Sequence, residues 1–242
     1  MALDRIPNVV KYSNQVFWEL AMGVKERRQR EKTQVRERIL DAALEFFARE
    51  GVEGVTMRAL ADAIEYSPPV IYAHFKDKDA IIRELCNRQI RSLAQAFSTF
   101  GALDPVERLR RIGYSYADFA VEHPSHFRFL FLMEHALPDG DELGDDPEEN
   151  AYAFLKQTVK DGLAAGAFRA GYTDAEEIAQ ICWGSAHGLV ALHNIKAEAS
   201  WIDWRDARTS AHRLIDVTLN GLLKPEATKR AARPAPVRRR SR

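Results

Sequence analysis

The stretch TMRALADAIEYSPPVIYAHFKDK, residues 56–78, reads as two short helices joined by a tight turn. Thr56 is a good N-cap for the first helix, because its hydroxyl can accept a hydrogen bond from a backbone N–H of the first turn. Apolar residues then recur at spacings of three and four, which is the pattern of one buried helix face. These residues are Ala59, Leu60, Ala63 and Ile64.

The second helix follows a break in the apolar pattern at residues 65–66. Ser67 can cap this helix with its hydroxyl, and Pro68 suits its first position, where the missing N–H costs nothing. The apolar residues that continue the helix run to Phe75. Two short helices joined by a turn predict a helix-turn-helix, whose second helix enters the major groove of DNA.

The same stretch resembles the N-terminal DNA-binding domain of the TetR (tetracycline-repressor) family of bacterial regulators. The resemblance covers about residues 34–85, and its most specific part is the tyrosine–x–x–phenylalanine–x–x–lysine ending formed by Tyr72, Phe75 and Lys78. One position departs, because the family usually has glycine in the turn where this chain has Glu65. A non-glycine residue with positive φ costs about 1 kcal/mol. The other matching residues are Phe46, Phe47, Gly51, Thr56, Met57, Arg58, Leu60, Ala61, Ser67, Pro68, Ile71, His74 and residues 76–80.

The resemblance implies two groups of DNA-contacting residues. Phosphate contacts are expected at Thr56, Arg58, Tyr72, His74 and Lys78. The groove-facing residues of the second helix are Ser67, Pro68, Pro69 and Val70. Since proline and valine offer only apolar contact, base discrimination is expected to depend on Ser67, Arg58 and DNA shape. The alternative is a helical hairpin in which Tyr72 and His74 only pack.

Helical periodicity continues along the chain, and no stretch alternates as a strand, so the predicted fold class is all-α. The other predicted helices cover about residues 35–50, 77–100, 106–122, 150–167, 173–197 and 203–223. We expect four parts: a partly disordered N-terminal extension (1–32), a three-helix DNA-binding domain (33–85), a helical effector-binding and dimerisation bundle (86–224) and a basic disordered tail (225–242). Residues 137–149, acidic and interrupted by proline and glycine, are predicted to form a mobile loop.

The formal net charge of zero conceals an uneven distribution of charge along the 242 residues. Residues 25–38 hold seven basic and three acidic side chains, and residues 224–242 hold eight basic and one acidic. Residues 84–223 hold 13 basic and 21 acidic side chains. Basic ends on an acidic body suit a protein that presents part of its surface to a polyanion.

The composition is that of a globular protein, with 46% hydrophobic and 29% charged residues. The absence of an apolar run of about 18 residues and of a signal peptide predicts a cytoplasmic protein without a membrane partner. Cys86 and Cys182 lie in helical patterns, so we expect two buried thiols rather than a disulfide.

The second half contains a motif of its own. Residues 183–188 (WGSAHG) resemble the tryptophan–x–x–x–histidine–glycine signature of one C-terminal domain class within the same family, and the helix start at Pro124 also fits that class. Ligand pockets are mostly apolar with a few polar groups, so an effector of unknown identity, largely apolar, is expected there. The candidate lining residues are Tyr116, Phe119, Phe127, Phe131, Trp183 and His187. For each of them plain core packing is the alternative.

The last two long helices resemble the pair that forms dimers in this family. Gly184, Ala186 and Gly188 would allow close approach of helices, so we expect a symmetric homodimer with a four-helix interface. The predicted function is a sequence-specific transcriptional regulator, a repressor released from a palindromic operator by a small molecule.

Two alternatives to this function remain. One is a DNA-binding protein that uses its basic arms without sequence preference. The other is a helical enzyme built on His123, His126, His135, His187 and His193, which lack the spacing of a metal motif. We expect no catalytic residue, cofactor or metal.

Overall fold

The computed structural model describes residues 9–133 and 144–227, and within these ranges it confirms the all-α prediction. A single isolated β-bridge joins Phe168 to Leu223 in the described part. Most of the predicted loop 137–149 and of the tail 225–242 lies outside the described residues. The DNA-binding half contains α1 (Val9–Glu50), α2 (Met57–Ala63), α3 (Pro68–Tyr72) and α4 (Lys78–Ser98). The second half contains α5 (Pro105–Glu122), α6 (Pro124–Phe127), the π-helix η1 (Arg128–Leu132), α8 (Ala151–Ala164), α9 (Ala175–Lys196) and α10 (Ala207–Leu222).

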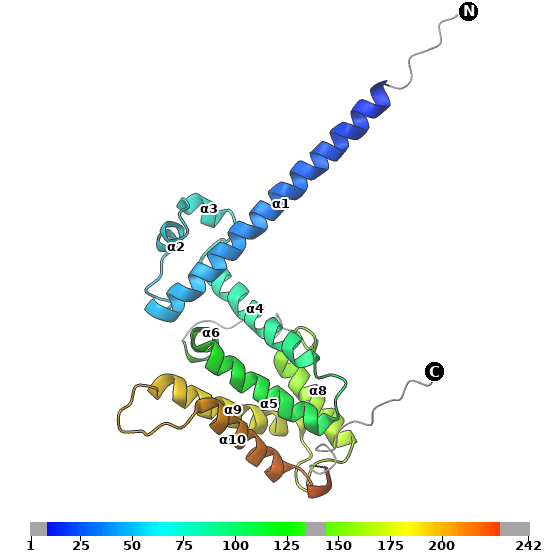
Figure 1. Ribbon diagram of the computed structural model, residues 1–242, viewed down its shortest axis with the longest axis vertical. Coiled ribbons are helices and arrows are strands. Elements are labelled where there is room, and N and C mark those ends of the chain that lie inside the picture. Colours follow the sequence, from blue (N-terminus) through cyan, green and yellow to red (C-terminus); the bar gives the residue numbers. More distant parts are fainter. Residues whose placement is uncertain (1–8, 134–143, 228–242) are drawn as a thin grey trace, which may run out of the picture.

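Helix α1 begins much earlier than the helix predicted for residues 35–50. It starts at Val9 and projects well beyond α2 and α3 (Figure 1). Residues 25–38 are rich in Arg, Lys, Glu and Gln, which are strong helix formers, and no glycine or proline falls between Gly23 and Gly51. No break in the backbone therefore marks the predicted boundary at residue 33. Gly51, with φ of +75°, ends the helix.

The helix-turn-helix has the predicted order, with one correction to its capping. The Thr56 hydroxyl accepts from the Ala59 N–H at 3.1 Å, as expected. Ser67 is the N-cap of α3 by backbone geometry, but its hydroxyl forms no capping hydrogen bond. Pro68 and Pro69 remove the N–H groups of the first two helical positions. The next one, on Val70, donates to the Ser67 carbonyl at 2.9 Å, so the hydroxyl finds no helix N–H to accept from.

The turn between α2 and α3 contains Glu65 with φ of +59°, the left-handed conformation that favours glycine. Glu65→Gly is expected to raise the free energy of unfolding by about 1 kcal/mol, because the cost of a side chain at positive φ disappears. Denaturant titration at one fixed protein concentration measures this difference. Glu65→Ala is the control, since it removes the carboxylate and keeps the strain. An equal gain from alanine would show that charge, not backbone strain, sets the stability of the turn.

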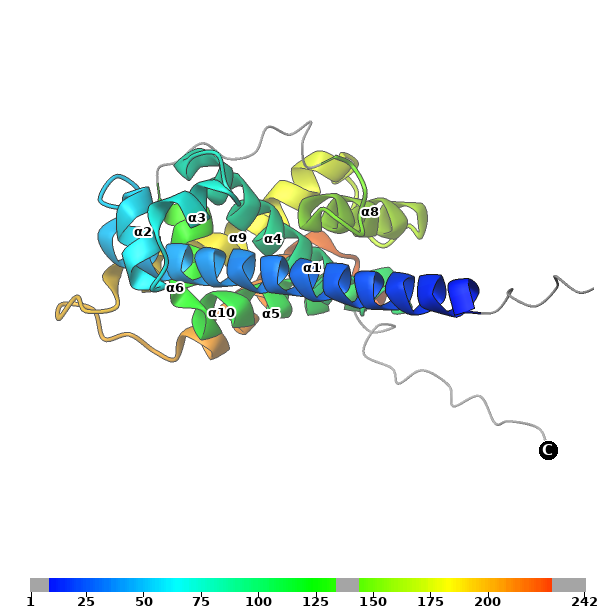
Figure 2. The same cartoon turned by 90° about the horizontal axis from the view of Figure 1, so that it is seen from above.

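The second half is a helical bundle in which α5, α8, α9 and α10 pack together, and α4 leads into it from the DNA-binding half (Figure 1). One apolar core runs through both halves. The Phe47 ring of α1 stacks on the Phe129 ring of η1, with centroids 5.6 Å apart. Figure 2 shows α6 directly below α1 at the end of the molecule that carries α2 and α3. The DNA-binding half is thus packed onto the bundle through α4, α6 and η1.

The predicted buried face of α2 is only partly correct, because Leu60 is buried, Ala59 is half-buried and Ala63 is exposed. In the core of the DNA-binding domain, Phe47, Leu60, Ile71 and Phe75 are buried, whereas Phe46 and Ile64 are only half-buried at its edge. The two cysteines are free thiols, and burial raises the pKa of each to about 12. Within the described ranges, no helix is both long enough and apolar enough to cross a membrane.

Candidate functional site

The residues predicted to contact DNA lie on α2 and α3 with their N-caps, on the segment that joins α3 to α4 and at the first residue of α4. Helices α2 and α3 pack against each other beside the C-terminal half of α1. Thr56, Arg58, Ser67, Pro69 and Tyr72 are exposed there, and the Tyr72 side chain reaches 56% exposure. An exposed aromatic residue of this size in a five-residue helix is available for contact with a partner. The remaining four, Pro68, Val70, His74 and Lys78, are half-buried.

Arg36 of α1 fixes the end of α3. Its guanidinium donates to the His74 carbonyl at 2.9 Å, lies 4.1 Å from the centre of the Phe75 ring and pairs with Glu84 at 3.0 Å. The Lys78 ammonium donates to the Val52 carbonyl at 2.8 Å and so closes the turn after α1. These contacts join four segments around α3 and hold its exposed face in one orientation.

The His74 imidazole is half-buried near two cations of α1, Lys32 and Arg36. Burial first, and then the positive charges of Lys32 and Arg36, lower the pKa of His74, so its imidazole is neutral at pH 7. Its Nδ1 atom is buried and has no hydrogen-bond partner in the described structure. A neutral imidazole can still donate one hydrogen bond to a phosphate oxygen, with much less electrostatic attraction than a charged one.

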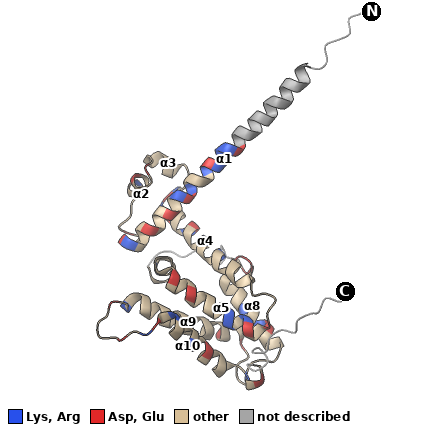
Figure 3. Ribbon diagram, viewed as in Figure 1, with Lys and Arg blue, Asp and Glu red and all other residues tan. Residues whose placement is uncertain are grey.

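Charge is divided between the helices of this half. Helix α3 has no charged residue, and Figure 3 shows it without blue or red. Arg27, Arg28, Arg30 and Lys32 are exposed on the described part of α1, and Arg58 is exposed on α2. An uncharged helix flanked by cations fits a surface in which the cations bind phosphates and the middle faces base edges.

The bundle encloses a cavity of about 460 Å³. This volume lies within the range that holds a drug-sized ligand. Residues of α4, α5, η1, α8, α9 and α10 form its wall, and most of them are apolar. They include Ile90, Leu93, Phe97, Leu109, Ile112, Leu130, Leu155, Ile215 and Leu219.

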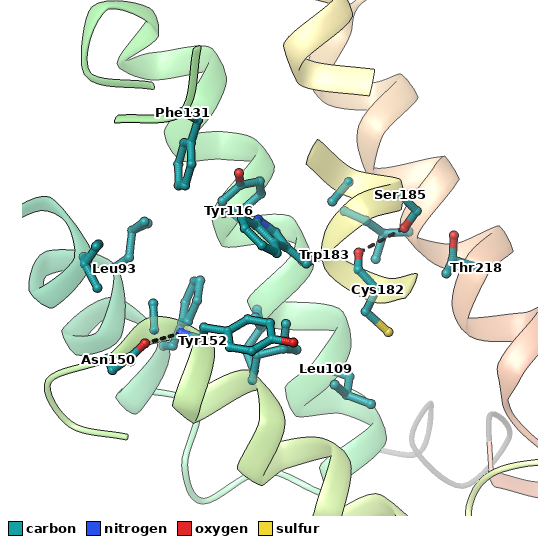
Figure 4. Close-up of a pocket in the computed structure, with 18 of the residues that line it drawn as sticks. Leu93, Leu109, Tyr116, Phe131, Asn150, Tyr152, Cys182, Trp183, Ser185 and Thr218 are labelled. Carbon is teal, nitrogen blue, oxygen red and sulfur yellow. Dashed lines mark hydrogen bonds between the residues drawn. The ribbon is translucent and has the colours of Figure 1, made fainter. Parts of the chain in front are cut away.

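Three of the six predicted lining residues are in this wall: Tyr116, Phe131 and Trp183. Figure 4 shows the side chains of Trp183, Tyr152 and Tyr116 in this wall. Centroid distances of 5.8 Å from Tyr116 to Phe131 and of 6.2 Å from Phe131 to Trp183 place these rings in edge contact. They form one aromatic side of the cavity.

The other three, Phe119, Phe127 and His187, are not in the wall, so the prediction needs correction there. Phe127 is fully buried behind Tyr116, with ring centroids 6.1 Å apart. His187 lies one turn beyond Trp183, and its Nδ1 is hydrogen-bonded to the Tyr116 hydroxyl at 2.8 Å. Burial lowers the pKa of His187, which suits a neutral imidazole that holds Tyr116 in place. Phe119, one helical turn after Tyr116, lies beside His123 instead.

Sequence reasoning missed the contributions of α8, α4 and α10 to the wall. Tyr152 follows the helix cap Asn150, whose amide accepts from the Tyr152 N–H and donates to the Gly144 carbonyl, both at 2.9 Å. The signal available in the sequence was an aromatic residue one turn or less after a capping asparagine. That signal does not reveal which way the helix faces.

The histidines considered for an enzyme do not assemble into a metal site in the described part of the chain. No group of three or more His, Cys, Asp or Glu side chains that could hold an ion occurs among the described residues. His123 and His126 lie near each other, with centroids 5.4 Å apart. His187 pairs with Tyr116, and His193 lies against Trp204. His135 lies outside the described residues.

Helices α9 and α10 each carry exposed apolar side chains. A Cβ atom added at Gly184 or Gly188 would meet nothing within 4 Å. Leu192 and Ile195 continue the same face of α9 at 55% and 59% exposure, and Val217 of α10 is 67% exposed. Ala186, predicted to help helix approach, is buried inside the bundle and lines the cavity instead. A surface with this many exposed apolar side chains is typical of a protein interface.

Two family models match this chain. Residues 39–85 match "Bacterial regulatory proteins, tetR family", and residues 109–218 match "Tetracyclin repressor-like, C-terminal domain". The two matched segments together span most of the described chain. The second description does not specify the tryptophan–histidine–glycine class, which stays a prediction.

Curated relatives are similar over part of their length. The uncharacterized HTH-type transcriptional regulator YobS of Bacillus subtilis (strain 168) is 33% identical over 102 residues, which are 40% of this chain and 51% of YobS. The probable acrEF/envCD operon repressor of Escherichia coli (strain K12) is 27% identical over 144 residues, 58% of this chain and 66% of the repressor. The chain thus spans about half to two thirds of these relatives.

Solved structures share the fold over most of the chain. SmeT, the repressor of the Stenotrophomonas maltophilia multidrug efflux pump SmeDEF, superposes with a TM-score of 0.60 at 21% identity, over 79% of this chain and 92% of SmeT. The fatty acid degradation regulator FadR of Bacillus halodurans gives a TM-score of 0.64 at 17% identity, over 77% and 95%. Together with the two family models, the exposed helix-turn-helix and the cavity-containing bundle show that this chain belongs to the TetR family of bacterial regulatory proteins.

Proposed function

We propose that the protein is a transcriptional repressor that binds a palindromic operator as a homodimer and is released by a small molecule in the bundle cavity. The main support is an exposed, uncharged α3 whose C-terminal end is held by a hydrogen bond from Arg36. The DNA-binding half that contains α3 packs onto a bundle that encloses a cavity of about 460 Å³. The buried residues that hold α3 and those that line the cavity belong to one continuous apolar core, so a change at the cavity can alter the position of α3. A protein with this function acts where its DNA is, in the bacterial cytoplasm.

In this proposal α3 enters the major groove. Ser67 and Pro69 face the bases, since both are exposed at its start. Thr56 and Arg58 at the start of α2, and Tyr72 at the end of α3, bind phosphates on either side. The remaining DNA-contacting residues in this proposal are Pro68, Val70, His74 and Lys78. Lys78 retains two N–H donors for phosphate beyond the one that the Val52 carbonyl accepts.

The homodimer forms through the apolar face of α9 and α10. Two copies related by a two-fold axis place the same face of each pair together, which gives a four-helix interface. Gly184 and Gly188 allow the α9 helices to approach closely, because neither has a neighbour within 4 Å of the Cβ position in one copy. Two reading heads then meet two half-sites of the operator.

The ligand acts through contacts between the two halves. Arg88 of α4 pairs with Glu37 of α1 at 2.7 Å and lies 3.5 Å from Asp41, while Phe47 stacks on Phe129 of η1. Phe131, at the other end of η1, lines the cavity. A ligand that moves η1 or α4 therefore changes the position of α1 relative to the bundle. Operator affinity falls by the ratio of the ligand's affinities for the two conformers.

Selection of bound DNA from a random pool, at low and at physiological salt, tests the proposal. Enrichment of an inverted repeat that persists at the higher salt concentration is the expected result. The alternative of basic arms that bind without sequence preference predicts no enriched motif and binding that disappears as salt rises. That outcome would refute the assignment of α3 as the helix that recognises the DNA sequence.

Arg58→Ala gives a sharper test of one contact on the selected operator. Loss of one phosphate contact is expected to weaken binding to all sequences about equally and to reduce the slope of log K against log salt by about 0.9. Fluorescence anisotropy at several salt concentrations measures both quantities. Arg111→Ala, an exposed arginine of α5 in the bundle, is the matched control. An unchanged slope for Arg58→Ala would remove Arg58 from the phosphate contacts.

A further inference from the structure

The wall of the cavity has an unusual balance of polar groups. Among its described residues Asp145 carries the only charged side chain, and neither lysine nor arginine is present. Asp145 is exposed, at the start of the segment that leads into α8, and forms no ion pair with a described residue. An anion in this cavity would meet a carboxylate at the mouth and no opposite charge.

Three hydroxyl groups of the wall, on Tyr116, Tyr152 and Ser185, are already hydrogen-bonded within the protein. The Tyr152 hydroxyl donates to Glu176, and the Ser185 hydroxyl donates to the Cys182 carbonyl at 3.0 Å. The Tyr116 hydroxyl is paired with the His187 Nδ1 atom at 2.8 Å. An anionic group would therefore find few remaining donors and no cation in the described part of the wall to replace its hydration shell.

The aromatic rings offer the opposite chemistry. Tyr152 and Trp183 lie with centroids 5.7 Å apart, and Trp183 is 39% exposed, so this pair stands at the rim of the cavity. The hydrogen bond from Asn150 to the Gly144 carbonyl holds the neighbour of Asp145 at the start of α8, close to Tyr152. Ring faces carry partial negative charge and attract cations. An exposed carboxylate and two neighbouring ring systems thus line the same apolar cavity.

We infer that the cavity binds a hydrophobic organic cation, with its apolar body inside the bundle and its charged group between Asp145, Tyr152 and Trp183. The inference rests on the proposed function only in assigning the cavity to an effector, and it adds the chemical class of that effector. The cationic group stays near the mouth, where water still reaches it, so the cost of removing the charge from water is small.

Three probes of matched shape test this by calorimetric titration of the full-length protein without DNA. They are (6-phenylhexyl)trimethylammonium, its neutral isostere with a tert-butyl group in place of trimethylammonium, and 6-phenylhexanesulfonate. The cation is expected to bind about tenfold more tightly than the neutral isostere. The sulfonate is expected to bind more weakly than both. The inference would be overturned if the isostere or the sulfonate bound as tightly as the cation or more tightly. It would also be overturned if the cation showed no binding at about 1 mM.

Two variants locate the charge. Asp145→Asn is expected to lower the affinity for the cation about threefold and to leave the isostere unchanged, since the carboxylate is solvent-screened. Glu148→Gln is the matched control, an exposed acid three residues on that does not line the cavity. An equal effect of both variants would mean that only the general acidity of the segment matters and would overturn the assignment to Asp145.

Operator binding separates this inference from the proposed function. If the cation binds the protein but leaves the operator complex intact, the release mechanism fails and the chemical class stands. If neutral or anionic compounds release the operator and the cation does not bind, the release mechanism stands and the chemical class fails.

Discussion

Replacing Gly188 by glutamate is expected to convert the protein into a monomer and to weaken operator binding by about 100-fold or more. Gly188 lies in α9 with open space around its Cβ position, on the same face as the exposed Leu192 and Ile195. In a two-fold interface the substitution appears twice, so two carboxylates would be buried close together without partners. A monomer then loses the gain from binding two half-sites at once.

Light scattering after size-exclusion chromatography measures the mass, and anisotropy measures operator affinity. Glutamate is a better helix former than glycine, so a loss of dimer here cannot be attributed to a destabilised helix. Gln95→Glu, at an exposed position of α4, is the control and should leave both quantities unchanged. A Gly188→Glu protein that remains dimeric would place the interface on another face.

Replacing Phe47 by alanine is expected to lower the free energy of unfolding by about 3–5 kcal/mol. The Phe47 side chain is fully buried, and its ring lies nearly parallel to that of Phe129, at an interplanar angle of 11°. The substitution leaves a cavity where α1 meets η1, so it weakens the DNA-binding domain and its attachment to the bundle together. Denaturant titration at one protein concentration measures the loss, because stability of a dimer depends on concentration.

The neighbouring residue provides the control for Phe47. Phe46 is half-buried and its ring lies 4.8 Å from the Arg49 guanidinium at the surface. Phe46→Ala is therefore expected to cost about 1 kcal/mol, the typical effect of a substitution outside the core. Similar losses for the two variants would mean that the Phe47–Phe129 stack adds no particular stability to the contact between α1 and η1. A double-mutant cycle of Phe47 and Phe129 would then give no coupling energy.

Local features of the DNA-binding domain could be predicted from sequence because each depends on a few consecutive residues. Thr56 and Asp77 cap α2 and α4 with hydrogen bonds of 3.1 and 2.8 Å, as their side-chain chemistry favours. Pro68 opens α3 as expected. The backbone strain at Glu65, where the family usually has glycine, could also be predicted, and Glu65 does adopt a positive φ. The predicted Ser67 cap is wrong because Pro69, like Pro68, has no backbone N–H to donate to the Ser67 hydroxyl.

The cavity, by contrast, could be predicted only in part. Aromatic residues at helical spacing identified Tyr116, Phe131 and Trp183 as wall residues, but the same pattern also suggested His187, which closes the wall from behind through Tyr116. Periodicity tells which residues share a face of one helix. It does not tell whether that face meets another helix or an open space between helices.

The sequence by itself therefore determined the all-α class and the two helices of the helix-turn-helix, because caps, turn residues and apolar periodicity act within one or two helical turns. The family followed from the resemblance of the motif residues between Thr56 and Lys78. Only the tertiary structure decided that α8 contributes Tyr152 to the cavity, that Asp145 stands at its mouth and that Ala186 faces inward rather than toward a partner. Those outcomes depend on the distances and angles at which six separate elements pack. Contacts between side chains far apart in the sequence determine these distances and angles.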